Sequence, residues 1–130
     1  MKNVLYSFLL FLMPVLLQAK SYHSGIEKND GPKLTFKTVI IDYGIIEKNA
    51  DPLRKFSFKN TGDEPLLIIN AKGTCGCTVP QYPTEAISPG QSSEIEVRYD
   101  TKRVGVFKKT ITVTSNSEES IILTIMGEVR

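Results

Sequence analysis

The stretch Phe107-Lys108-Lys109-Thr110-Ile111-Thr112-Val113-Thr114 carries the clearest structural pattern in this chain of 130 residues. Phe107, Ile111 and Val113 fall on one side of an extended backbone, whereas Lys108, Thr110, Thr112 and Thr114 fall on the other. This period of two predicts a strand with one face on a core and the other in water. A turn is favoured at residues 115–117. Alternation then resumes, with an apolar face formed by Ile121, Leu123, Ile125 and Val129.

The same alternation recurs upstream of these two segments. Residues 94–99 and residues 55–59 each alternate apolar with polar side chains, so each predicts a half-buried strand. A tight turn is predicted at residues 60–63, and a turn or bulge at residues 42–44. Residues 66–71 form an apolar run, which predicts a strand covered on both faces.

These segments together predict the fold class. Apolar residues at helical spacing are not found after the N-terminal region. Short strands with regular turn signals predict an all-β fold, an immunoglobulin-like β-sandwich of about seven strands over residues 33–130. The usual Cys…Trp…Cys framework is missing, since the chain has no tryptophan and its two cysteines stand one residue apart. A disulfide between the sheets therefore cannot form.

The N-terminus predicts export. Lys2 precedes a short apolar run from Val4 to Leu17, and Ala19 offers a small residue for cleavage, so residues 1–19 are predicted to be a signal peptide. The run is too short to span a bilayer, and no membrane insertion is expected after cleavage. Residues 20–32 are polar and are predicted to form a flexible lead-in. The expected location is the bacterial periplasm, the cell surface or the medium.

Composition argues against several classes of function. The formal net charge is +2 with lysines and acids interspersed, and the absence of a basic stripe argues against a nucleic-acid partner. The sole histidine, His23, lies in the predicted lead-in, and no Ser-His-Asp set is visible. The glycines are scattered, which argues against a phosphate-binding loop. We therefore expect a protein that is not an enzyme and that is monomeric or weakly associating.

Cys75-Gly76-Cys77 holds both cysteines of the chain. Residues i and i+2 of a strand point to one face, so the two thiols are neighbours, and Gly76 also permits a turn. A disulfide that closes about three residues contributes only about 1.6 kcal/mol by loop entropy, and ring strain can offset that gain. Three roles stay open: a strand–loop junction, a redox dithiol or labile disulfide, and a site for Cu(I), which favours thiolates.

The cysteine pair stands within an ordered set of segments that resembles a known family. The set is Phe56–Gly62, Pro65–Ile68, Cys75–Pro80 and Ser88–Gly90. It is similar to the bacterial family called domain of unknown function 1573, over roughly residues 34–130. The resemblance implies an immunoglobulin-like domain, similar in fold to major sperm protein and hydin-type interaction modules. It also implies an exported, often periplasmic protein with no assigned activity.

We interpret the chain as an interaction module whose partner is an envelope protein or peptide. Exposed strand edges can accept an added strand. The loops around residues 72–90 are a second candidate surface, with Lys72, Thr74, Thr78 and Tyr82 as candidate contact residues. No cofactor is expected, apart from Cu(I) on Cys75 and Cys77 under the alternative hypothesis of a copper-binding or redox protein. A structural subunit of an envelope assembly is a third interpretation.

Overall fold

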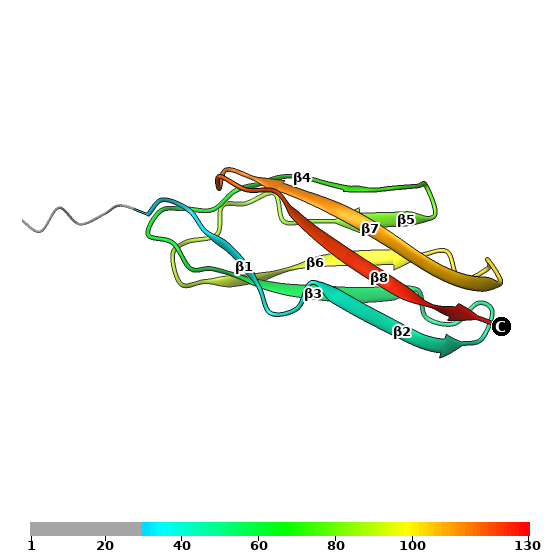
Figure 1. Ribbon diagram of the computed structural model, residues 1–130. Coiled ribbons are helices and arrows are strands. Elements are labelled where there is room, and N and C mark those ends of the chain that lie inside the picture. Colours follow the sequence, from blue (N-terminus) through cyan, green and yellow to red (C-terminus); the bar gives the residue numbers. More distant parts are fainter. Residues whose placement is uncertain (1–29) are drawn as a thin grey trace, which may run out of the picture.

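The computed structural model describes residues 30–130 and consists of two four-stranded sheets packed face to face (Figure 1). The first sheet has the order β1-β3-β6-β5 and the second the order β2-β8-β7-β4. The strands are β1 (Leu34–Phe36), β2 (Ile40–Ile46), β3 (Leu53–Asn60), β4 (Ile68–Gly73), β5 (Thr78–Gln81), β6 (Ser92–Tyr99), β7 (Gly105–Ser115) and β8 (Ile121–Val129). The predicted all-β, immunoglobulin-like sandwich is thereby confirmed. No helix that could span a membrane occurs in residues 30–130.

The predicted signal peptide, residues 1–19, and residues 20–29 of the predicted lead-in lie outside the described residues. Both therefore stay predictions. The last residues of that lead-in pack on the turn after β3. The backbone N–H of Asp63 donates to the carbonyl of Gly31 at 3.1 Å, and the N–H of Asp30 donates to Oδ2 of Asp63 at 3.2 Å.

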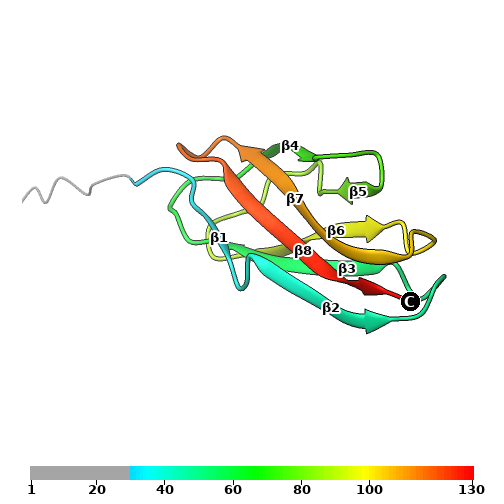
Figure 2. The same ribbon diagram turned by 45° about the vertical axis from the view of Figure 1, so that its right-hand side comes forward.

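The N-terminal strand is divided between the two sheets, which explains why eight strands are present where about seven were expected. β1 pairs antiparallel with β3, and β2 runs parallel to β8. The chain crosses between the sheets over residues 37–39, as Figure 2 shows. The passage of a strand from one sheet to the other does not change the alternation of apolar residues, so the sequence pattern does not predict it.

The bulge predicted at residues 42–44 is confirmed in β2. The register of β2 against β8 shifts between Asp42 and Ile45. Gly44 has a φ of 69°, and its N–H donates to Oδ1 of Asp42 at 2.7 Å. A side-chain oxygen and a glycine in the left-handed region together hold this local turn within the strand.

The prediction of a fully covered strand at residues 66–71 is wrong. β4 is the edge strand of its sheet, because it pairs only with β7. Ile68 is buried, but Leu67 is 40% and Ile69 is 55% exposed. The outward-facing side chains are apolar too, so the usual polar–apolar alternation of a half-covered strand is hidden.

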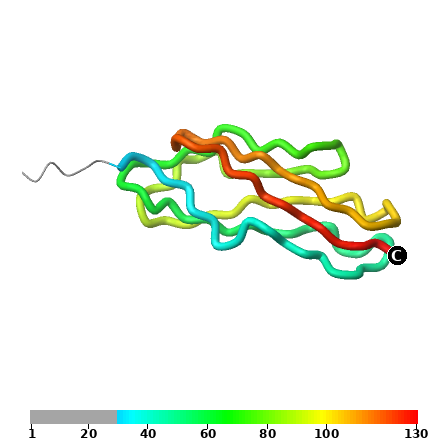
Figure 3. The backbone as a smooth tube through the Cα atoms, in the orientation of Figure 1, coloured from blue at the N-terminus to red at the C-terminus, as the bar shows by residue number. Residues whose placement is uncertain are grey.

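Figure 3 traces the backbone of the two layers. The core lies between them and follows the predicted alternation. Its fully buried apolar side chains are Phe56, Leu66, Ile95, Val97, Ile111, Val113, Leu123 and Ile125. Aromatic residues close one end, where the rings of Tyr99 and Phe107 stack with their centroids 3.8 Å apart. Inward-facing side chains of β3, β6, β7 and β8 thus form one core between two layers.

Candidate functional site

The two cysteines form a disulfide in the connection between β4 and β5. We call residues 73–78 the disulfide turn. The N–H of Thr78 donates to the carbonyl of Cys75 at 3.3 Å, and the N–H of Thr74 donates to the carbonyl of Thr110 on β7 at 3.1 Å. The carbonyl of Cys77 accepts the N–H of Asp100 at 2.8 Å. The backbone of the turn is therefore tied to both sheets.

The two sulfur-bearing residues differ in exposure. Cys77 is only 5% exposed and belongs to the core, whereas Cys75 is half-buried against it. Gly76 is exposed at the tip, and a Cβ placed there would meet nothing within 4 Å. The bridge thus has one side packed in the protein and one side open. The Cu(I) hypothesis concerns the reduced pair, because a disulfide offers no thiolate.

The structure separates the candidate contact residues of the loops by exposure. Lys72 and Thr74 are exposed, whereas Thr78 is buried and its Oγ1 lies 3.8 Å from Sγ of Cys77. Tyr82 is half-buried, and its hydroxyl donates to the carbonyl of Ile69 at 3.3 Å, on the edge of β4. Lys72, Thr74 and Tyr82 are therefore the side chains of this set that remain accessible.

A shallow hollow of about 500 Å³ lies beside the disulfide turn. Gly76, Cys77 and Val79 line one part of it, and Val79 is 51% exposed. Arg98 and Lys102 add two cations to the lining. Tyr99 lines it too, and burial raises the pKa of its phenol, so this group is neutral at ordinary pH. The sequence pattern did not reveal this hollow, because its residues come from separate strands and turns.

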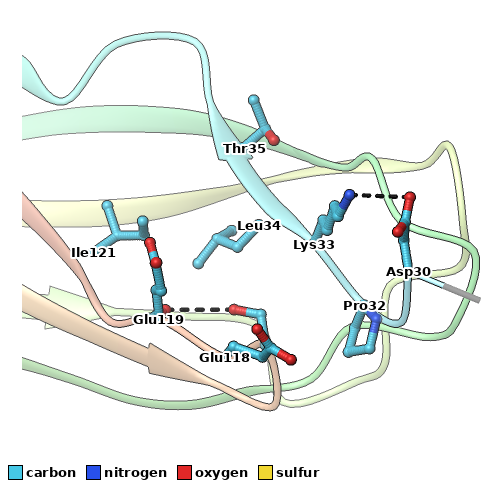
Figure 4. A pocket seen from close by; sticks show the side chains of 9 residues that line it. Asp30, Pro32, Lys33, Leu34, Thr35, Glu118, Glu119 and Ile121 are labelled. Carbon is cyan, nitrogen blue, oxygen red and sulfur yellow. Dashed lines mark hydrogen bonds and ion pairs between the residues drawn. The ribbon is translucent and has the colours of Figure 1, made fainter.

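A second hollow, of about 470 Å³, lies between β1 and the turn that joins β7 to β8. Figure 1 shows that β1 and this turn lie at the end of the sandwich away from the connection between β4 and β5, which holds the disulfide turn. We call this hollow the β1–β8 groove. The half-buried side chains of Leu34 and Ile121 lie across from one another in it, as Figure 4 shows. The groove therefore reaches the margin of the core between the two sheets.

Two strand edges border the β1–β8 groove. β2 joins β8 only from Thr124, whose N–H donates to the carbonyl of Val39 at 2.8 Å. Within residues 30–130 no strand pairs with the first residues of β8 on this side. Backbone polar groups of a strand alternate in direction, so those of Ile122 point the same way as those of Thr124, toward the open side.

The other border is the free edge of β1. The residues on either side of β1 bond toward β3: the carbonyl of Lys33 accepts a hydrogen bond from the N–H of Thr61 at 3.0 Å, and the N–H of Lys37 donates to the carbonyl of Ser57 at 3.0 Å. By the same alternation, the polar groups of Leu34 and Phe36 face away from β3. Among the described residues, 30–130, both sheets thus present unpaired backbone to one groove.

The rim of the groove is acidic. Glu118 and Glu119 are exposed on the turn between β7 and β8 (Figure 4). Asp30 pairs with Lys33 through a contact of 3.2 Å between Oδ2 and Nζ. The balance of formal charge among these four side chains is negative, which favours a basic occupant.

Comparison with known proteins agrees with this architecture. A protein of unknown function from Porphyromonas gingivalis W83 aligns with a TM-score of 0.67 and 13% identity over 77% of this chain and 48% of its own length. PapD-like domain 7 of human CEP192 aligns with a TM-score of 0.61 and 9% identity over 78% of this chain and 87% of the domain. The periplasmic chaperone SfaE aligns with a TM-score of 0.53 and 10% identity over 75% of this chain and 57% of its own.

At these identities the solved structures show a shared fold and no more. No curated protein matches the chain. The model of a family described as protein of unknown function (DUF1573) matches residues 34–129, which confirms the resemblance drawn from the cysteine block and its neighbouring turns. This chain therefore belongs to the DUF1573 family.

Proposed function

We propose that this protein is an exported, non-enzymatic interaction module that binds an extended segment of an envelope protein in the β1–β8 groove. The observation that carries the proposal is the meeting of two strand edges, unpaired within residues 30–130, beside the apolar side chains of Leu34 and Ile121. An added strand would supply hydrogen-bond partners to the backbone of Ile122 on one sheet, or to Leu34 and Phe36 on the other.

The chemistry of the groove defines the occupant. An apolar side chain of the bound segment would enter between Leu34 and Ile121, which are already half-buried against the core. Its flanking residues would be lysine or arginine, facing Glu118 and Glu119. The partner segment is therefore extended, alternately apolar, and basic at its ends.

Export rests on the predicted signal peptide. The fold shared with a periplasmic chaperone is compatible with that location. A similar fold also occurs in other proteins named as chaperones, including one in a pre-assembly complex of chaperone and tip adhesion subunit, CsuC–CsuE. These likenesses support a binding role for the sandwich.

A synthetic peptide with alternating valines and flanking lysines tests the proposal. We expect the peptide to bind and to slow hydrogen exchange at the Ile122 amide or at the Leu34 and Phe36 amides, because these N–H groups point into the groove. Ile121→Glu should abolish binding, whereas Ile122→Glu should not, since the 60% exposed Ile122 side chain points away. Equal loss in both variants, or unchanged exchange at the amides of Ile122, Leu34 and Phe36, would refute strand addition in the groove.

Charge reversal provides a second test that leaves the core intact. Glu118→Lys with Glu119→Lys should weaken the basic peptide about tenfold, as expected for two lost rim attractions of roughly 0.7 kcal/mol each. Glu47→Lys with Glu85→Lys changes the net charge equally at exposed positions outside the groove. If the two double variants weaken binding equally, the attraction is a property of the whole protein and not of this rim.

A further inference from the structure

The disulfide turn is held by backbone contacts that do not depend on its bridge. The N–H of Thr74 donates a hydrogen bond to the carbonyl of Thr110 on β7, and the carbonyl of Cys77 accepts one from the N–H of Asp100, which follows β6. β4 and β5 continue this pairing on either side of the turn. A bridge closing so short a segment contributes little through chain entropy. Its reduction should therefore leave the turn in place, with the two thiols still adjacent.

The surroundings of the bridge leave it open to another molecule. Cys75 is the more exposed partner, and Gly76 next to it has open space around its Cα. The hollow beside Gly76 and Cys77 offers the apolar Val79 and the cations Arg98 and Lys102. A segment of a second protein can lie in this hollow and bring a thiolate toward the open side of the bridge. Such access distinguishes exchangeable disulfides from buried structural ones.

We propose that the Cys75–Cys77 disulfide is a thiol–disulfide exchange site that accepts two electrons from a protein dithiol. The first thiolate of the dithiol attacks Sγ of Cys75, and the bond between the two cysteine sulfurs breaks. The electron pair goes to Sγ of Cys77, which takes up a proton. The product is a mixed disulfide between the dithiol protein and Cys75.

The second thiol of the dithiol protein completes the exchange. After losing its proton it attacks the first sulfur of that protein, and the bond to Cys75 breaks. Cys75 leaves as a thiolate and takes up a proton. The dithiol protein has then lost two electrons and two protons in forming its own disulfide, and Cys75 and Cys77 have gained them. This activity is independent of peptide binding in the β1–β8 groove, which lies at the other end of the sandwich.

Reduction of the folded protein is the first test. The oxidised protein is incubated with reduced thioredoxin as the dithiol, then alkylated and weighed as an intact protein. We expect one disulfide formed in thioredoxin for each Cys75–Cys77 bridge lost, with an unchanged circular dichroism spectrum. A bridge that reacts only after denaturant is added, or a protein that unfolds on reduction, would overturn the proposal. An antibody domain with an inter-sheet disulfide serves as the unreactive control.

The site of attack is tested with the two single variants. Cys77→Ser leaves the half-buried Cys75, and Cys75→Ser leaves the buried Cys77. We expect Cys77→Ser to form a mixed disulfide with oxidised glutathione at least tenfold faster than Cys75→Ser, because thiol access controls this rate. Thermal unfolding of each variant establishes that both are folded. Equal rates, or the reverse order, would contradict the assignment of Cys75 as the attacked sulfur.

Discussion

Asn60 is the residue on which the wall of the β1–β8 groove depends. It is fully buried at the end of β3, and its side chain makes four hydrogen bonds. Its Oδ1 accepts the N–H groups of Lys33 and Gly62 at 3.3 and 3.0 Å. Its Nδ2 donates to the carbonyls of Glu64 and Ile87 at 2.7 and 2.9 Å. One amide thus joins β1, the turn after β3 and the segment before β6.

Replacement of this amide should be costly. We expect Asn60→Ala to reduce the free energy of unfolding by about 3 kcal/mol, because several buried backbone groups lose their partners. Urea denaturation measures the change. Asn70→Ala, at an exposed position of β4, is the matched control and should shift stability by less than about 0.5 kcal/mol. A small effect of Asn60→Ala would mean that water replaces the amide.

The two glycines of the disulfide turn should respond differently to a methyl group. A Cβ on Gly73 would lie 2.6 Å from the backbone oxygen of Thr78, so we expect Gly73→Ala to cost about 2 kcal/mol through overpacking. A Cβ on Gly76 would meet no atom within 4 Å, and Gly76→Ala should be within about 0.5 kcal/mol of wild type. Thermal unfolding of both variants in the oxidised state measures the difference. Equal destabilisation of the two variants would show that the close approach of Gly73 to the backbone of Thr78 does not exclude a side chain at position 73.

Among the elements, strands with one polar face were predictable, as was the bulge of the edge strand β2, but the open face of the edge strand β4 was not. β3, β6, β7 and β8 follow the alternation of apolar residues, because each has one face on the core. β4 did not reveal its open face, since Leu67 and Ile69 are exposed yet apolar. The cysteine spacing placed two sulfurs together, but only the fold shows which one is buried.

The edge strand β2 gives a prediction at the same scale. Its bulge requires Gly44 at a φ of 69°, where a side chain costs roughly 1–2 kcal/mol. We expect Gly44→Ala to lower the melting temperature by several degrees, although a Cβ there would touch nothing within 4 Å. Gly44→Asn should lower it less, because asparagine tolerates this conformation. If the two variants melt together, backbone strain at Gly44 is not the cause.

At the scale of the whole molecule, the groove arises from topology. Within residues 30–130, the crossing of the chain from β1 to β2 leaves the start of β8 unpaired on the side away from β7, and it leaves one edge of β1 free. Neither strand is unusual in composition. A single sequence predicts the two layers from local patterns, whereas the junction between them depends on which strand lies beside which. The proposed binding site was therefore beyond prediction, although the fold that creates the groove was not.

The aromatic end of the core links global stability to alkaline pH. Burial raises the pKa of Tyr43 above 10.0, although the Arg54 guanidinium, 4.0 Å from the ring centroid, acts in the opposite sense. Burial raises the pKa of Tyr99 as well. Above pH 10 the unfolded chain therefore loses phenol protons that the folded protein keeps. The contribution of these two phenols to the free energy of unfolding is fully present below pH 10. It should be lost as the pH rises through their folded-state pKa values.

Tyr43→Phe separates this proton linkage from the hydrogen bond of the same side chain. The Tyr43 hydroxyl donates to the carbonyl of Pro52 at 2.7 Å, so the variant should lose about 1 kcal/mol at neutral pH. Above pH 10 its stability should decline less steeply than that of the wild type, by up to about 1.4 kcal/mol per pH unit, because one linked proton is gone. Urea midpoints measured from pH 8 to 11 give both quantities. Parallel curves for the two proteins would mean that Tyr43 ionises alike in the folded and unfolded states, and that the alkaline loss of stability originates elsewhere.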